Sequence, residues 1–246
     1  MLLLQTGVGV GPVRASQNPQ RAAKILERTI GGKVRGLSYR GMMTWLLGLM
    51  LSCSGASGQG KAAAKRAAPD PAPVKSFGSK SAPITMEVFS DFQCPACRVL
   101  FLDTIRPVMQ NYVSAGKVYF VHRDMPLPVH PYSREAARYA NAAAKLGKLE
   151  QVAEALYARQ DLWSANGNVD AVVALVLTPA EMVKVRQYVR SGQLDAGIDK
   201  DVALANSQLV RSTPTIMLTH KGQVFPIVGV VSYPILRQFL EEQLRK

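Results

Sequence analysis

The stretch that decides the fold reads ITMEVFSDFQCPACRV, residues 84 to 99. Its first part, Ile84 to Phe89, is a short apolar run typical of a buried strand, and Ser90-Asp91 is a turn-forming pair. Cys94-Pro95-Ala96-Cys97 then leads into the apolar-periodic stretch Val99 to Val113. This order predicts a strand, a turn and a helix that begins at the two cysteines.

The position of the cysteines at a helix start has chemical consequences. Two thiols three residues apart in the first turn lie close enough to pair. Cys94 also faces the unsatisfied N–H groups and the positive end of the helix dipole, which stabilise a thiolate. Pro95 fits because the first turn needs no N–H there. We therefore expect Cys94 to be the exposed nucleophile with a low pKa, and Cys97 to be the more buried resolving thiol.

Two other interpretations of the pair are a structural disulfide and a metal site. A disulfide that closes a four-residue loop stabilises by only about 2 kcal/mol on the chain-entropy model, against roughly 3 kcal/mol for fifteen residues. Tetrahedral zinc usually needs four ligands, and the histidines have no paired spacing with the cysteines: His122, His130 and His220. Redox chemistry is therefore the favoured interpretation, and no metal or cofactor is expected.

A second element lies more than a hundred residues later, at Ser212-Thr213-Pro214-Thr215. It precedes a β-branched run, Ile216 to Thr219, then a Lys221-Gly222 turn, a strand over Gln223 to Val228 and a helix from about Tyr233. The order of these elements is that of the thioredoxin fold. The bond before Pro214 is expected to be cis, leaving nearby backbone groups open to a substrate strand beside the thiols.

With these motifs in view, residues 84 to 246 resemble the DsbA-like thiol-disulfide oxidoreductases of the thioredoxin superfamily. The resemblance rests on three segments: FSDFQCPAC, YFVHRDMPLPVHP from Tyr119, and VRSTPTIML followed by Gly229. It implies an α/β fold, a thioredoxin fold with an inserted α-helical domain. The expected domains are 84–131 with 210–246 for the thioredoxin-like part, and 132–209 for the insertion.

The insertion reads as almost wholly helical. Tyr132 to Leu146 is rich in alanine, and Leu149 to Leu162 carries apolar residues on one face. Thr178-Pro179-Ala180-Glu181 is a capping box with proline at the first helical position, and Gly192 marks the end of that helix. Three aromatic residues are expected in the core and not in a substrate platform: Phe101, Tyr157 and Trp163.

The sequence departs from the family pattern in the surroundings of the cysteines. Many relatives have a buried acid six residues before the first cysteine, where this chain has Val88. Glu87 should point to the opposite face of the strand, so a carboxylate relay is doubtful and water is an alternative. The Pro-Ala dipeptide lacks the histidine of the strongest oxidants. His130 is interpreted as a helix-start or packing residue.

The resemblance implies disulfide exchange with protein substrates, with Cys94 and Cys97 as catalytic residues. Thr213, Pro214, Pro95 and Ala96 are the expected substrate-binding residues. The oxidant direction is favoured, with a periplasmic reductase or isomerase as the alternative and a tethered peptide-binding module or chaperone as a further one. The expected partners are exported proteins that contain cysteine and a membrane redox protein that restores the cysteine pair.

The net charge of +13 sits mainly at the N-terminus, where residues 1–83 hold 12 Lys or Arg against two acids. Residues 84–246 hold 18 against 15, so the folded part has no strongly basic face and nucleic acid is not an expected partner. No apolar run approaches the roughly 20 residues of a membrane-spanning helix.

Residues 33–56 have the order of an export signal. Basic residues precede a ten-residue apolar run, Met42 to Leu51, and small residues follow. Cys53 after Met50-Leu51-Ser52 resembles the lipobox of bacterial lipoproteins, although Met50 replaces the usual leucine. Lipidation of Cys53 is favoured, with ordinary cleavage nearby or an uncleaved anchor as alternatives. The expected location is the bacterial periplasm or envelope, with a lipid anchor.

The remaining N-terminal segments complete the expected organisation. Residues 1–53 hold an upstream extension, interpreted as an overextended reading frame, and the signal. Residues 54–83 are almost entirely Gly, Ala, Ser, Lys and Pro, which predicts a disordered linker that spans about 30 Å. The domain from about Ile84 is expected to fold without residues 1–82.

Overall fold

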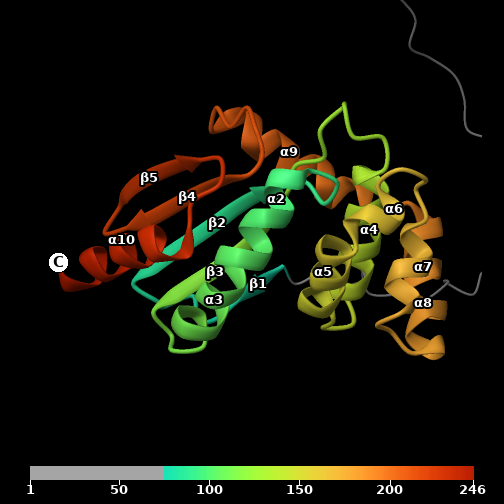
Figure 1. Ribbon diagram of the computed structural model, residues 1–246, viewed down its shortest axis with the longest axis horizontal. Coiled ribbons are helices and arrows are strands. Elements are labelled where there is room, and N and C mark those ends of the chain that lie inside the picture. The colour runs from blue at the N-terminus through green and yellow to red at the C-terminus, as the bar shows by residue number, and fades with distance from the viewer. Residues whose placement is uncertain (1–74) are drawn as a thin grey trace, which may run out of the picture. The chain divides into compact units, whose positions relative to one another are not determined.

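The computed structural model describes residues 75–246, and the sequence-based interpretations of residues 1–74 lie outside it. The described part is a five-stranded sheet with helices on it and beside it (Figure 1). The strands are β1 (Ser76–Phe77), β2 (Ile84–Ser90), β3 (Val118–Asp124), β4 (Thr215–His220) and β5 (Gln223–Val228). Their order across the sheet is β1-β3-β2-β4-β5, with β2 and β3 parallel and the other pairs antiparallel.

The helix that follows β2 begins at the cysteines, as the sequence predicted. It runs through α2 (Pro95–Leu100), η1 (Phe101–Ile105), α3 (Arg106–Val108) and η2 (Met109–Val113). Segments η1 and η2 are π-helical, which the apolar period did not indicate. Pro107 lies between them in α3, where it has no N–H to donate and its ring crowds the preceding turn.

The segment between β3 and β4 is helical throughout, and this confirms the expected insertion. Its helices are α4 (Ser133–Ala144), α5 (Leu149–Ala158), α6 (Gln160–Trp163), α7 (Val169–Ala174), α8 (Pro179–Ser191) and α9 (Asp195–Ser207). Helices α4 to α8 gather on one side of the sheet (Figure 1). The capping box at Thr178 is present, and Gly192 ends α8 with a φ of 69°. The helix expected over Leu149 to Leu162 breaks at Arg159, whose ψ of 29° leaves the helical range.

Two large buried clusters hold the fold together. One lies between the sheet and the helices α2 to η2 and α10 (Tyr233–Arg245), and its members include Met86, Ile105 and Leu236. The other lies inside the insertion and extends to both cysteines. Trp163 and Tyr157 are fully buried in it and Phe101 packs against it, so the prediction of core aromatic residues is confirmed.

The linker predicted over residues 54–83 is too long at its C-terminal end. Ser76 and Phe77 form the edge strand β1 against β3, and the Phe77 ring lies 6.1 Å from that of Phe120. Lys75 is nearly buried and forms ion pairs with Asp124, at 2.6 Å, and with Asp201. The composition of the segment did not predict these contacts, because only one cation and one aromatic ring join it to the domain.

The groups around Asp124 stabilise its ionised form. Burial alone would raise the pKa of Asp124, but the charge of Lys75 and a hydrogen bond from His122 outweigh it, and the pKa falls well below its usual range. Asn141 Nδ2 donates to the same carboxylate at 2.8 Å.

Within residues 75–246, no helix is long and apolar enough to cross a membrane.

Replacement of Lys75 by methionine should destabilise the domain strongly. The change leaves the buried carboxylates of Asp124 and Asp201 without their shared cation, which is expected to cost about 3 kcal/mol or more of the free energy of unfolding at neutral pH. Urea denaturation measures this loss, and Lys80→Met, at an exposed position of the same segment, is the control. An equal effect of the two substitutions would contradict the assigned role of Lys75.

The effect of Lys75→Met should also depend on pH. The depressed pKa of Asp124 contributes stability that is present above the unfolded value of about 4 and is lost as the pH falls through the folded value. The difference between wild type and Lys75→Met should therefore shrink in acid below about pH 4.

Candidate active site

The two cysteines stand at the N-terminus of α2. Cys94 is the N-cap residue, with an extended backbone, and Pro95 is the first helical residue. Both cysteines are free thiols. Cys94 is 7% exposed and Cys97 is 1% exposed, so the expected order of exposure holds. Cys94 is nevertheless less exposed than the sequence indicated, because the apolar cluster of the insertion packs around it.

The two thiols have opposite pKa shifts. A hydrogen bond from the Cys97 side chain lowers the pKa of Cys94 to about 5, and this outweighs the effect of burial. The backbone N–H groups of Cys97 and Ala96 and the side chain of Thr213 also lower it. Burial raises the pKa of Cys97 far above its usual range, and the hydrogen bond to Cys94 adds to this. At neutral pH, Cys94 is therefore a thiolate and Cys97 a thiol.

The loop before β4 lies against Cys94. The Thr213–Pro214 bond is cis, as the sequence predicted. Cys94 Sγ lies 3.6 Å from the Thr213 carbonyl oxygen, which accepts a hydrogen bond when Cys94 is protonated. The Pro214 carbonyl instead accepts from the Gly229 N–H at 2.8 Å. The structure thus brings Thr213 and Pro214 to the cysteines, while exposed Pro95 and half-buried Ala96 lie on the first turn of α2.

The surroundings of β2 agree with the departure noted in the sequence. Val88 is buried in the core between the sheet and its helices. Glu87 points away from it and pairs with Arg123 at 2.5 Å. No carboxylate occupies the place of the buried acid of many relatives.

The sequence did not single out Asp91, whose side chain is nonetheless fully buried beside the cysteines. Its carboxylate accepts four hydrogen bonds, from Gln93 N at 2.7 Å, Leu127 N at 2.8 Å, His130 Nδ1 at 2.8 Å and Ser133 Oγ at 2.5 Å. His130 thus supports Asp91, in keeping with its interpretation as a packing residue. A turn-forming Asp three residues before a helix start was the available signal, because such side chains often bond to the backbone of their own turn.

The insertion fixes the loop that carries Cys94. Gln160 Nε2 donates to the carbonyl oxygens of Phe92, at 2.7 Å, and of Cys94, at 3.1 Å. Gln93 accepts from Tyr132 N at 2.8 Å and donates to Ser164 O at 2.8 Å. The helical insertion is therefore part of the framework of the site.

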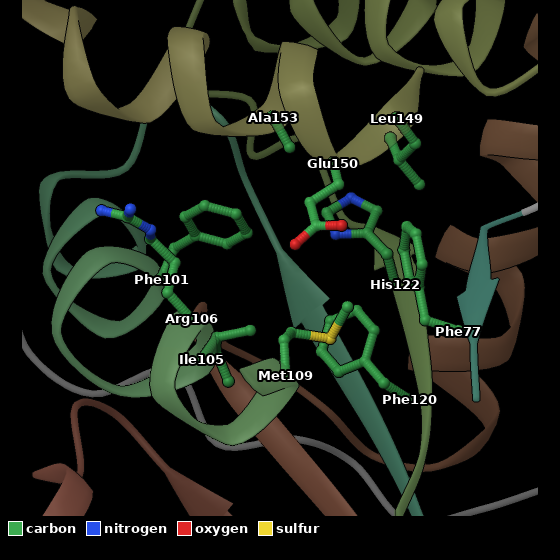
Figure 2. Close-up of a pocket in the computed structure, with 10 residues that line it drawn as sticks. All are labelled: Phe77, Phe101, Ile105, Arg106, Met109, Phe120, His122, Leu149, Glu150 and Ala153. Carbon is green, nitrogen blue, oxygen red and sulfur yellow. The ribbon is translucent and has the colours of Figure 1, made fainter. Parts of the chain in front are cut away.

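A small, mainly apolar pocket lies apart from the cysteines, between the helix that follows them, β1, β3 and α5 (Figure 2). Ile105, Met109 and Phe120 line it, and the His122 ring and the Glu150 carboxylate reach it. The space open to the centre of a water molecule is about 20 Å³, room for about one water. Neither cysteine contributes to its lining.

Among residues 75–246, no group of three or more His, Cys, Asp or Glu side chains could hold a metal ion.

Comparison with known families decides the family of this arrangement. The family model described as thioredoxin matches residues 73–224, more than half of the chain. The chain belongs to the thioredoxin family.

The fold is similar to that of solved DsbA-like proteins. Oxidised BdbD of Bacillus subtilis superposes with a TM-score of 0.59 at 20% identity, over 72% of this chain and 98% of that one. Alpha-DsbA1 of Wolbachia pipientis superposes with a TM-score of 0.60 at 18% identity, over 70% of this chain and 92% of that one. A thioredoxin-like oxidoreductase of Silicibacter pomeroyi superposes with a TM-score of 0.54 at 24% identity, over 73% of this chain and 95% of that one. Family and fold together confirm the expected DsbA-like thioredoxin fold, with a helical insertion between β3 and β4.

Curated relatives match over part of their length. The chain is 28% identical over 170 residues to the Na⁺/H⁺ antiporter NhaA 3 of Salinispora tropica, which is 68% of this chain and 25% of the antiporter. It is 28% identical over 149 residues to NhaA 1 of Mycolicibacterium gilvum, or 58% and 23%. The chain thus spans about a quarter of the length of the curated relatives it matches.

Alkylation of the reduced protein should show the asymmetry of the two thiols. Cys94 should react with iodoacetamide down to mildly acidic pH, with an apparent pKa near 5, while Cys97 stays unlabelled until the protein unfolds. Mass spectrometry of the labelled peptides over a pH series measures this. In Cys97→Ala the pKa of Cys94 should rise towards its ordinary value, because the largest cause of its depression is removed. First labelling at Cys97 would contradict the assignment.

Proposed function

We propose that this protein exchanges disulfides with cysteine-containing protein substrates through Cys94 and Cys97, and that it acts as an oxidant. The observation that carries the proposal is the pair of free thiols at a helix start, one thiolate and one buried thiol, beside the Thr213–Pro214 loop. A structural staple needs no difference in pKa between its cysteines. A nucleophile and a resolving thiol need this difference.

The proposed oxidation has two steps. A substrate thiolate attacks Cys94 Sγ in the Cys94–Cys97 disulfide, so that a mixed disulfide forms and Cys97 leaves as a thiolate that takes a proton from solvent. A second substrate thiolate then attacks the substrate sulfur of the mixed disulfide and releases Cys94 as a thiolate. The substrate gains a disulfide, and its two electrons remain on the reduced pair.

The oxidant direction is supported by the thiolate of Cys94. A low pKa stabilises the reduced form of the pair and makes its disulfide a stronger oxidant. A reduction potential near −120 to −200 mV in glutathione buffer would support the oxidant, while a value near −270 mV would assign the protein to the reductases.

The substrate would lie along the first turn of α2 and the Thr213–Pro214 loop. Pro95 and Ala96 border the cysteines on one side, and the apolar side chains of Val228 and Val230 are exposed on either side of Gly229, which bonds to Pro214. An extended peptide could use backbone groups of the loop and place an apolar residue here. Thr213, Pro214, Pro95 and Ala96 are therefore the proposed substrate contacts.

Exchange activity should depend on Cys94. The wild type should accelerate two reactions: the reduction of insulin, followed by precipitation of its B-chain, and the oxidative refolding of a reduced protein. Cys94→Ser should accelerate neither, because the serine hydroxyl cannot form the mixed disulfide. Cys97→Ala should accumulate mixed disulfides. Equal behaviour of wild type and Cys94→Ser would remove the enzyme proposal and leave a non-enzymatic peptide-binding module.

We further propose that the protein works in the bacterial periplasm or envelope, anchored through lipidated Cys53. The support is the export-signal order of residues 33–56 and the position of Cys53 as the cysteine left over from the redox pair. The chain resembles about a quarter of the length of proteins named as Na⁺/H⁺ antiporters, which also fits a domain that works beside a membrane. The proposed partners are exported proteins with cysteines and a membrane protein that restores the disulfide.

The anchor proposal predicts where the protein is found in cells. Cys53→Ser should move it from the membrane fraction to the soluble periplasm or stall its processing, because no lipid can then be attached. Fractionation with immunoblotting measures this, and Ser54→Ala is a neighbouring control. A mature chain that starts at an unmodified residue after Cys53, as seen by mass spectrometry, would overturn the anchor and leave the exchange activity untouched.

A further inference from the structure

The buried thiol Cys97 has two hydrogen-bond partners besides Cys94. The Asp91 backbone N–H donates to its sulfur at 3.4 Å. The side chain of Ser90, the residue before Asp91, lowers the pKa of Cys97 as a hydrogen-bond donor to the thiolate. Ser90 Oγ in turn lies 2.7 Å from the hydroxyl oxygen of Tyr157. Ser90 and Tyr157 are both buried, so these contacts are shielded from bulk water.

Tyr157 comes from α5 of the insertion, 67 residues after Ser90. Its ring is held between two others, with centroid distances of 5.0 Å to Phe92 and 4.8 Å to Phe101. Within residues 75–246, Ser90 is the one hydrogen-bond partner of its hydroxyl group. The ring position is thus fixed by packing, and the hydroxyl is directed at Ser90.

The nearby carboxylates of Asp91 and Asp124 do not hydrogen bond to the Cys97 sulfur. The Asp91 side chain already accepts four hydrogen bonds, none of them from a cysteine. Asp124 is engaged by Lys75, His122 and Asn141. Val88 stands where a carboxylate would have to be.

We propose that Ser90 and Tyr157 are positioning residues for the exchange reaction, forming a hydrogen-bond chain from α5 that steadies the sulfur of Cys97 while it is a thiolate. The proposal rests on the proposed exchange activity and deepens it, because Cys97 becomes a thiolate in both directions of the reaction. It assigns part of the active site to the helical insertion.

The chain can serve Cys97 in both protonation states. When Cys97 is a thiolate, Ser90 donates to its sulfur and Tyr157 donates to Ser90. In the reduced pair the proton of the Cys97 thiol is donated to Cys94, and the Cys97 sulfur stays a weak acceptor for the Ser90 hydroxyl. Burial and the neighbouring charges of Cys97, Asp91 and Asp124 raise the pKa of Tyr157 well above its usual range, so its proton is retained throughout.

The step to be measured is the resolution of a mixed disulfide with glutathione. In the reduced protein, the Cys94 thiolate attacks oxidised glutathione, forms a Cys94–glutathione disulfide and releases one glutathione thiolate. Cys97 then loses its proton to solvent and attacks Cys94 Sγ, which forms the Cys94–Cys97 disulfide and expels the second glutathione thiolate. Two electrons thus pass from the cysteine pair to glutathione.

The test compares the full chain with Tyr157→Phe and Ser90→Ala. The reduced proteins are mixed with oxidised glutathione and quenched in acid at intervals, and mass spectrometry follows the glutathionylated form at a series of pH values. In both variants resolution should slow roughly tenfold, as expected for loss of a hydrogen bond that supports a charged group, with the pH profile displaced upwards by about one unit. Attack by Cys94 should keep its wild-type rate.

Tyr139→Phe is the matched control. Tyr139 lies on α4 of the same insertion, and its hydroxyl donates to Asp170 at 2.8 Å, away from the cysteines. This variant should resolve the mixed disulfide at the wild-type rate and pH. Far-UV circular dichroism and thermal unfolding verify that each variant is folded under the assay conditions, so a lower stability alone would not displace the pH profile.

The possible outcomes separate the two proposals. If the wild type resolves the mixed disulfide and Tyr157→Phe does so with the same rate and pH profile, the assigned role of the chain is wrong while exchange stands. If Tyr157→Phe fails to fold, the decision passes to Ser90→Ala, which removes the link next to the sulfur. If the wild type forms no mixed disulfide with glutathione, the proposed exchange itself fails.

Discussion

The buried carboxylate of Asp91 is the interaction on which the site depends. A charged carboxylate without partners is expensive to bury, and four donors surround this one. Two of these donors belong to the loop after β3, one to the turn before α2, and one to the first residue of α4. One side chain therefore joins the loop of the cysteines to the start of the helical insertion.

The geometry at Cys94 follows from this arrangement. Because the turn before α2 is fixed from several directions, Cys94 occupies the N-cap and the N–H groups of the first turn converge on its sulfur. Burial alone raises the pKa of both thiols; hydrogen bonds outweigh it at Cys94, while it prevails at Cys97. It shields Cys97 from solvent and keeps it protonated, and it leaves the hydrogen bonds to Cys94 undiluted by water.

The parts of the fold that could be predicted from sequence are those governed by local rules. The strand over Ile84 to Phe89, the helix start at Pro95 and the capping box at Thr178 each depend on neighbouring residues only. The family resemblance supplied the insertion and the relation of the cysteines to Pro214. The catalytic assignment of Cys94 and Cys97 remains a proposal that the geometry supports.

The rest of the site depends on contacts between distant residues, which a single sequence does not contain. Lys75 meets Asp201 from 126 positions away, and Ser90 meets Tyr157 from 67. A lysine in a segment rich in small residues and a tyrosine on an apolar helix face both have ordinary local interpretations. Their roles appear only when the chain brings their partners to them.

The place where the chain joins the folded unit has a consequence for orientation. Lys75 pairs with Asp124, which lies opposite Ser90 in the register of β2 and β3, so the chain arrives at the end of the sheet that carries the cysteines. The other end of the sheet holds the β4–β5 turn, where Lys221 Nζ donates to the carbonyl oxygen of the last residue, Lys246. A cargo fused after Lys246 would therefore leave the cysteines unobstructed, whereas a bulky cargo placed shortly before Lys75 would crowd the end of the sheet that partners must approach.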